Sequence, residues 1–383
     1  QDNLGSSLYG SYAPNNFKVN FSDNGIINIP YVSMGANYPD VSWQKTTMKN
    51  IGLDFYLLSD RISGSFDFFR NDITRLLGYA STSPLAIYET RPINGGHYYR
   101  RGWELMVDTK NLVGEFTWDT SLTFSKTNSF WKERLPNYDY QIYQQRENEP
   151  MSAYYYYNVT GIINTDRSNM PESQKTLQAE AQLPGCPIIE DKNKDGKIDE
   201  NDVYMKDNSP AIYVGIGNTF TYKRFEFSFF MYGQFGIQKY NIAYSAAQAG
   251  PLAVDYPENS NKFAYRLWNS QTNPNGSRPG LAIGKMGALP GNAWVNADRE
   301  NASFMRMRNI TLAYNLAGNI LGSLQRYVRN IKVYVDAQNP FILTKFQGFD
   351  PEIYTGGGGA SGGPEVNILK PALSLSELIL LFK

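Results

Sequence analysis

A polar segment from Asp191 to Asp202 carries the clearest chemical pattern in this sequence. Its acidic and amide residues stand at the spacing of a calcium-binding loop, and Gly196 occupies the position where such loops turn sharply. Carboxylate, amide and carbonyl oxygens are the ligands that Ca²⁺ prefers. The sequence therefore predicts a structural Ca²⁺ site, and its expected ligands are Asp191, Asn193, Asp195, the carbonyl of Lys197, Asp199 and Asp202.

The last position of this segment departs from the calcium pattern. Asp202 stands where a Glu usually closes the loop, and its side chain is one methylene shorter, as in dockerin-type loops. The alternative is an ordinary solvated turn, because Asp, Asn and Gly are frequent in turns. A calcium sensor is disfavoured, since no pair of amphipathic helices flanks the segment.

No group of residues indicates a catalytic site. His97 is the single histidine, and neither a nucleophile elbow nor a triad spacing accompanies it. The 36 acidic residues could be paired in many ways for glycoside hydrolysis, so without geometry they carry no signal. Cys186 is the single cysteine and is interpreted as an incidental thiol. The prediction is that the chain is not an enzyme.

Aromatic residues gather in segments that we expect to be long connections. Flat rings stack on sugar or peptide faces and keep a hydroxyl or N–H for hydrogen bonding. The alternative is that the rings pack these segments against one another or against a partner. The predicted substrate-contacting residues are Tyr98, Tyr99, Trp131, Tyr154, Tyr155, Trp268 and Trp294.

The composition is typical of strands and turns. The chain has 383 residues, with 28 Tyr, 21 Phe, 33 Gly and 20 Pro, which favours an all-β fold. Lys plus Arg equals Asp plus Glu at 36 each, so that no net field would attract nucleic acid. The sequence contains no apolar run long enough for a transmembrane helix and no signal-peptide pattern at its start.

Apolar residues alternate with polar ones in a series of segments, which predicts antiparallel strands. Phe227 and Phe229, for example, are expected on one face and Glu226 and Ser228 on the other. The predicted strands cover approximately 51–57, 62–68, 103–107, 116–124, 214–222, 225–231, 303–316, 331–344 and 373–382.

The connections between these strands alternate in length. Short turns are expected near residues 59–60, 111–114 and 223–224, and a helical turn within 317–330. Long connections are expected at 71–100, 129–210, 237–302 and 345–372. Short turns at one rim and long loops at the other are typical of a transmembrane β-barrel. A soluble β-sandwich is the alternative, because its strands show the same alternation.

Three phrases resemble the SusC/RagA family of TonB-linked outer-membrane transporters. They are Asn37 to Asp54, Arg306 to Leu312 and Val333 to Glu352, so that the resemblance spans nearly the whole chain. The family often carries a polar segment like that from Asp191 to Asp202 at the same place. The resemblance implies the C-terminal strands of a plugged barrel of about 22 strands. Residues 1–48 would be an extracellular loop segment and residues 49–383 barrel strands, with no counterpart of the N-terminal plug.

The resemblance also implies a function and partners. The expected function is TonB-dependent import of a large nutrient, a glycan or oligosaccharide, across the Gram-negative outer membrane. The expected partners are a SusD-like surface lipoprotein that acts as a lid, the TonB system through the plug, and outer-membrane lipid. One alternative is an oligopeptide importer of the same architecture. Another is a secreted, calcium-stabilised β-rich adhesin or carbohydrate-binding module.

Overall fold

The computed structural model describes most of the chain. Side chains are described for residues 41–80, 91–136, 140–144, 148–241, 265–280, 283, 286–316, 331–348 and 350–352, and the backbone alone for the remaining strand residues. The chain divides into two compact units. The first comprises Gln1–Lys49, Arg70–Arg101 and Ser129–Met151, and the second comprises Asn50–Phe69, Gly102–Asn128 and Ser152–Lys383. Among the described residues, no helix has the length and apolar character required to cross a membrane.

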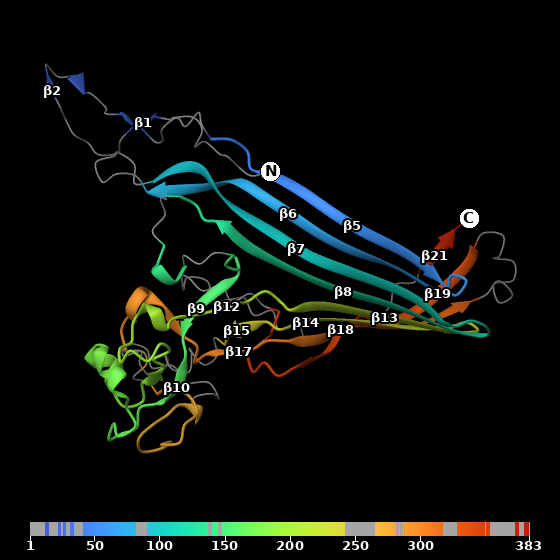
Figure 1. The fold of residues 1–383 in the computed structure, drawn as a ribbon. Helices are drawn as coiled ribbons and strands as arrows, with labels where there is room; N and C mark the ends of the chain where they lie inside the picture. The colour runs from blue at the N-terminus through green and yellow to red at the C-terminus, as the bar shows by residue number, and fades with distance from the viewer. Residues whose placement is uncertain are drawn as a thin grey trace. The chain divides into compact units, whose positions relative to one another are not determined.

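A 10-stranded sheet dominates the fold, in the order β20-β19-β18-β14-β13-β8-β7-β6-β5 with β21 also paired to β19 (Figure 1). Each long strand therefore lies beside its neighbours in the sequence, as the alternation predicted. The strands are β5 Lys45–Leu57, β6 Ile62–Ser81, β7 Thr90–Leu112, β8 Phe116–Glu133, β13 Ile212–Tyr222, β14 Phe225–Phe235, β18 Phe304–Leu316, β19 Val328–Thr344, β20 Ala372–Ser374 and β21 Ile379–Phe382.

The short turns lie where the sequence predicted them. Lys223 adopts a φ of 55° in the connection between β13 and β14, and Ser59 and Asp60 adopt 53° and 61° between β5 and β6. Left-handed φ is compatible with the sharp reversal that a tight antiparallel hairpin requires. The helical turn expected within 317–330 falls mainly outside the described residues.

Two predicted connections are wrong in extent. The segment 71–100 is largely strand, because β6 continues to Ser81 and β7 begins at Thr90. The segment 129–210 likewise begins as strand, because β8 continues to Glu133. These extensions are rich in polar residues, which we interpreted as loop. Polar contacts between the two strands, such as that of His97 of β7 with Asp72 of β6 at 3.3 Å, join them where apolar alternation is lacking.

The predicted last strand, 373–382, is also wrong as a single element. It is divided into β20 and β21, which pair with different parts of β19. Ser374 and Ser376 weaken the apolar alternation in this segment. A strand without a continuous apolar face gains little from a continuous ladder.

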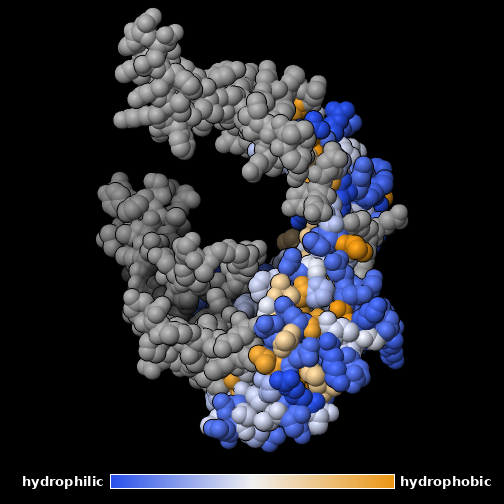
Figure 2. Space-filling view, turned by 90° about the vertical axis from the view of Figure 1, so that its left-hand side faces the viewer, coloured by the Kyte–Doolittle hydropathy of each residue, from blue (hydrophilic) through white to orange (hydrophobic). Residues whose placement is uncertain are grey.

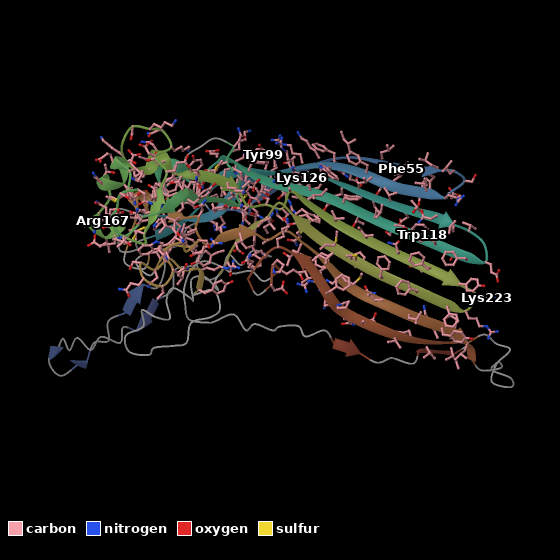
Figure 3. All side chains as sticks on the ribbon, turned by 90° about the horizontal axis from the view of Figure 1, so that it is seen from below. Phe55, Tyr99, Trp118, Lys126, Arg167 and Lys223 are labelled. Carbon is pink, nitrogen blue, oxygen red and sulfur yellow. The ribbon has the colours of Figure 1, made fainter. Side chains whose placement is uncertain are left out.

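The register of the central strands places aromatic rings together on one face. Phe220 of β13 stacks with Trp118 of β8 at 5.7 Å between ring centroids, and with Phe227 and Phe229 of β14 at 6.0 and 6.3 Å. Figure 3 shows Trp118 on its strand and Lys223 at the neighbouring turn. The opposite face carries Ser228 beside Thr311 in the ladder. This confirms the predicted division into an aromatic and a polar face.

The polar face has its own cross-strand contacts. Lys332 of β19 donates to Glu226 of β14 at 2.9 Å, and Thr311 of β18 donates to Asp336 of β19 at 2.6 Å. Polar side chains that bond to one another between strands are stable on a face that meets water. The aromatic face is therefore the one suited to lipid.

Arginine substitutions on the two faces of β14 are expected to change the free energy of unfolding by unequal amounts. Phe227→Arg is expected to lower the free energy of unfolding by up to about 4 kcal/mol, because arginine on the lipid face of a barrel strand has that cost near mid-membrane. Ser228→Arg, at the next position on the opposite face, is the matched control and is expected to cost much less. Urea titration of both variants in lipid vesicles measures the difference. Equal destabilisation would contradict the assigned faces.

Candidate functional site

The two longest connections are not loops in the ordinary sense but form a folded body within the second unit. We call it the loop body and define it as residues 152–207, 265–280, 283 and 286–301. Its elements include β9 Ala153–Tyr157, β10 Val159–Ile162, η3 Glu172–Thr176, η4 Ala179–Gln182, β11 Pro187–Ile189, η5 Glu200–Asp202, β12 Tyr204–Asp207, η9 Pro290–Asn292, β16 Trp294–Val295 and β17 Arg299–Asn301. Within the described residues, the predicted connections 129–210 and 237–302 are therefore corrected from loop to folded structure.

The loop body has its own buried core, drawn from both connections. Its buried apolar residues include Tyr157, Ile163, Leu177, Ile189, Val203, Leu267, Met286 and Leu289. Polar contacts join the two connections as well: Gln178 donates through Nε2 to the carbonyls of Met286 and Ala288, both at 3.0 Å. Because the two connections share a core and hydrogen bonds, each stabilises the other. On the face that Figure 2 shows, the described surface is mainly hydrophilic, with scattered hydrophobic residues.

The predicted calcium ligands lie in one tight turn at the edge of this body. Asp191 accepts from the N–H of Gly196 at 2.9 Å, and Asp195 accepts from that of Lys197 at 2.9 Å. Asn193 accepts from the N–H of Asp195 at 3.1 Å. Gly196 adopts a φ of 84°, a left-handed conformation that strains most other residues. The spacing thus produces the sharp turn that it predicted.

Asp202 and Asp199 close the turn. The Asp202 carboxylate is fully buried and accepts from the N–H groups of Lys192 and Asp199, at 2.8 and 2.9 Å. Asp199 accepts from the N–H of Asn201 at 2.8 Å, so that the two acids form a reciprocal cap at the start of η5. The shorter side chain at the last position is thus used to bond the backbone of the turn.

The described residues contain no grouping of three or more histidine, cysteine or acidic side chains with the geometry to hold a metal. The carboxylates are directed at the amides of the turn instead. One oxygen is an exception: Asp191 Oδ1 is buried without a hydrogen-bond partner. A buried carboxylate oxygen with no donor is costly, and a cation is one way to satisfy it.

The predicted aromatic residues fall into two separate groups. Tyr98 and Tyr99 lie on β7 and Trp131 on β8, within the first unit, and not on loops as predicted. Tyr99 is buried between Phe130, at 5.4 Å between centroids, and the guanidinium of Arg70, at 4.4 Å from its ring. Packing therefore accounts for both faces of Tyr99. Tyr154, Tyr155, Trp268 and Trp294 lie in the loop body.

Within the loop body, Tyr154 belongs to a stack of side chains. Its ring lies 5.2 Å from that of Tyr156, which lies 5.7 Å from that of Tyr204. Arg299 lies 3.7 Å from the Tyr154 ring centroid, and Lys192 lies 4.6 Å from that of Tyr204, so that cations end the stack on both sides. Burial raises the pKa of Tyr154 to about 12. The faces of these rings are thus occupied by one another.

Two tryptophans differ in exposure. The ring of Trp268 lies against Gly185 and Gly280, whose lack of a Cβ makes room for it. Trp294 of β16 is 80% exposed, although its strand is paired with Tyr156 in the register of the small sheet β12-β9-β16. Of the seven predicted aromatic residues, Trp294 presents the most open ring.

Sequence reasoning missed an ion-pair cluster. It joins two of the phrases that resemble the SusC/RagA family, Arg306 to Leu312 and Val333 to Glu352. Arg306 of β18 is 5% exposed and donates to both carboxylate oxygens of Asp350, at 2.8 and 2.7 Å, and also pairs with Glu352. Burial raises the pKa of Glu352. The neighbouring Arg308 stands at a bulge, because the register shifts between Met307 and Asn309. The signal was available, since arginines recur in one phrase and acids in the other.

Asp298 is a second buried group without a predicted role. It is 6% exposed, and its Oδ1 has no hydrogen-bond partner. Burial is the main reason that its pKa is raised to about 6; Glu300 raises it further, and Arg278 opposes the shift. Arg278 itself pairs with Glu300 at 2.9 Å. Asp298 therefore costs stability when it is ionised.

The raised pKa predicts a pH dependence of the loop body. Between the unfolded value of about 4 and the folded value of about 6, the folded state binds the proton more tightly, so stability falls as pH rises through this window. Asp298→Asn removes the ionisation and is expected to stabilise the loop body above pH 6 by up to about 3 kcal/mol, and to have little effect below pH 4.

Hydrogen exchange of residues 296–301 at pH 5 and pH 7.5 measures this effect. The matched control is Glu300→Gln, which removes the charge that pairs with Arg278 and is expected to destabilise the same segment. Asp298→Asn with exchange equal to wild type at both pH values would refute the assigned role of the Asp298 carboxylate.

Comparison with known proteins finds relatives that are all named as TonB-dependent receptors. No family model matches the chain. TonB-dependent receptor SusC of Bacteroides thetaiotaomicron is 27% identical over 326 residues, which is 83% of this chain and 30% of that protein. TonB-dependent receptor P3 of Formosa agariphila is 25% identical over 327 residues, which is 82% of this chain and 31% of that protein. The chain thus spans about a third of the length of these relatives. They are receptors, which confirms the prediction that the chain is not an enzyme.

The solved structures agree on the fold. The RagAB peptide importer in its closed-closed state superposes with a TM-score of 0.66 at 17% identity, over 90% of this chain and 36% of that one. The RagAB peptide transporter gives the same TM-score at 18% identity. Together with the aromatic and polar faces of the antiparallel sheet, these likenesses confirm the resemblance found in the sequence. The chain is thus similar over most of its length to SusC-like TonB-dependent receptors, and its antiparallel sheet has the fold of an outer-membrane β-barrel.

Proposed function

We propose that this chain forms part of the wall and vestibule of an active importer that takes up a large nutrient across the outer membrane. The observation that carries the proposal is the combination of a sheet with one aromatic face and a folded loop body formed by the long connections between its strands. Such a sheet suits a lipid-embedded wall, and a folded body suits recognition outside the membrane. The relatives are named as TonB-dependent receptors, which supports energy supply through the TonB system.

We further propose that the nutrient is a glycan or oligosaccharide. The open indole of Trp294 supports this substrate class, because sugar rings stack on exposed tryptophans. The loop body would meet a SusD-like lipoprotein that acts as a lid over the vestibule. An oligopeptide is the second candidate, and the similarity of the fold to a peptide importer favours it. The secreted adhesin is disfavoured, because the relatives are named as TonB-dependent receptors.

An uptake assay separates these substrates. A receptor-deletion strain that is complemented with the wild-type receptor is expected to deplete an oligosaccharide mixture from the medium, and to stop when TonB is deleted. Trp294→Ala is expected to reduce this uptake, whereas Phe346→Leu is a conservative control outside the loop body. Depletion of peptides alone would select the second candidate. Depletion of neither mixture by the wild type would reject import.

We propose a structural Ca²⁺ in the turn from Asp191 to Asp202. The support is the sharp turn at Gly196 and the buried, partnerless Oδ1 of Asp191. The carboxylates of Asp191 and Asp195 would rotate from the amides of the turn toward the ion, with Asn193, the Lys197 carbonyl, Asp199 and Asp202 completing the shell. Bound calcium would hold the turn closed; it would not take part in transport chemistry.

Two substitutions in the turn test the metal. Asp195→Ala is expected to abolish calcium binding, because it removes a carboxylate ligand. Lys197→Ala is the matched control and is expected to bind normally, since this position contributes its carbonyl. Calorimetry of the receptor in detergent, with limited proteolysis in calcium and in chelator, measures both. Absence of calcium uptake by the wild type would leave the segment as an ordinary polar turn.

A further inference from the structure

The aromatic face of the sheet becomes cationic along its strands, in the direction of the long connections. On β8, Trp118, Lys126 and Phe130 lie on one side, because side chains alternate along a strand. The Tyr99 ring stacks with that of Phe130 at 5.4 Å, which places Tyr99, and with it Arg101, on the same side of β7. Basic side chains therefore continue the face that begins as an aromatic surface.

This change falls at the depth expected for a membrane surface. The apolar band of a barrel is about 25 Å tall, and a strand tilted by about 40° rises about 2.5 Å per residue along the membrane normal. A band that begins at Phe116, the first residue of β8, therefore ends about 10 residues later, near Lys126. Gly102 of β7 lies beside this position, because a Cβ on Gly102 would be 2.3 Å from the Lys126 carbonyl oxygen. Arg101 is therefore expected where the lipid headgroups begin.

Aromatic rings, and not an acid, hold Arg101. Its guanidinium carbon lies 5.2 Å from the ring centroid of Phe130 and 6.0 Å from that of Tyr99. Such cation–π contacts orient the guanidinium and leave its N–H donors available. Arg101 is exposed, and no carboxylate of the described residues forms an ion pair with it. Arg70, which packs on the Tyr99 ring, is by contrast paired with Asp72 at 3.0 Å.

A second cation extends this patch. Lys132 is exposed and lies on the same side of β8 by the alternation of the strand. Among the residues that the structure describes, no acid is paired with it. Two acids of the first unit are already paired with other arginines, Asp72 with Arg70 and Glu149 with Arg134. We call Arg101 and Lys132 the cationic patch, and its positive charge is not compensated within the described part of the chain.

We infer that the cationic patch binds the phosphate group of a membrane-lipid headgroup. A guanidinium presents its N–H donors in a plane that matches the oxygens of a phosphate, and an ammonium adds a second positive charge. A lipid fits better than a soluble anion, because the patch continues the aromatic face that is suited to lipid, at the depth of the headgroups. The site would fix the height of this part of the wall in the membrane, and it does not depend on the imported nutrient.

Native mass spectrometry of the full receptor in a neutral detergent tests the site. The probes are phosphatidic acid and diacylglycerol with the same acyl chains, which differ in the phosphate alone. We expect the wild type to retain phosphatidic acid in preference to diacylglycerol. Arg101→Gln is expected to weaken the retention of phosphatidic acid about fivefold, the effect typical of one basic residue at a charged membrane surface. Adding Lys132→Gln is expected to weaken it further.

Arg100→Gln is the matched control, because Arg100 is the exposed neighbour on the opposite side of β7. We expect it to retain phosphatidic acid as the wild type does. Arg101→Lys keeps the charge and is expected to retain most of the binding, which separates loss of the site from loss of the fold. Equal retention of both probes by the wild type, or equal loss in Arg100→Gln and Arg101→Gln, would overturn the inference. Displacement of the lipid by millimolar inorganic phosphate would overturn the assignment to a lipid.

Discussion

The hydrogen-bond ladder of the backbone is the constraint on which the rest of this structure depends. In contact with lipid, no water is available to satisfy an exposed N–H or C=O, so each strand must be bonded to its neighbours along its length. Pairing sequence neighbours through tight turns meets this need with little loop entropy. The left-handed residues Ser59, Asp60 and Lys223 are the local cost of these turns. Once the ladder is formed, successive side chains of each strand necessarily point to opposite faces of the sheet.

The same alternation restricts the strands more than the long connections. A strand that is aromatic on one side and polar on the other has little freedom to vary its residues. The long connections have no such restriction, and here they bury Tyr157, Val203 and Leu289 in a core of their own. A connection with its own core can carry an exposed side chain such as Trp294 on a backbone that is itself folded.

Sequence reasoning succeeded where the determining interactions are local. The period of two in β13 and β14 and the spacing from Asp191 to Gly196 each fix a structure over a few residues. It failed where contacts between segments distant in the sequence determine the structure. The polar ends of β6 and β7 were interpreted as loops, although partners on other strands sustain them. The core of the loop body was not predicted either, because its residues come from two connections and have no common period.

The ion pairs of Arg306 show how two of the family-like phrases, Arg306 to Leu312 and Val333 to Glu352, depend on each other. A bulge shifts the register of β18 against β14 and β19 at Arg308, and one extra residue in a strand re-aims the side chains beyond it. Arg306 then reaches the segment after β19, donates two hydrogen bonds to Asp350 and forms an ion pair with Glu352. A buried guanidinium with several donors needs acceptors nearby, because an unpaired charge at this depth is strongly unfavourable. The acids of one phrase are therefore required by the arginine of the other, which gives a physical reason for finding the two phrases in one sequence.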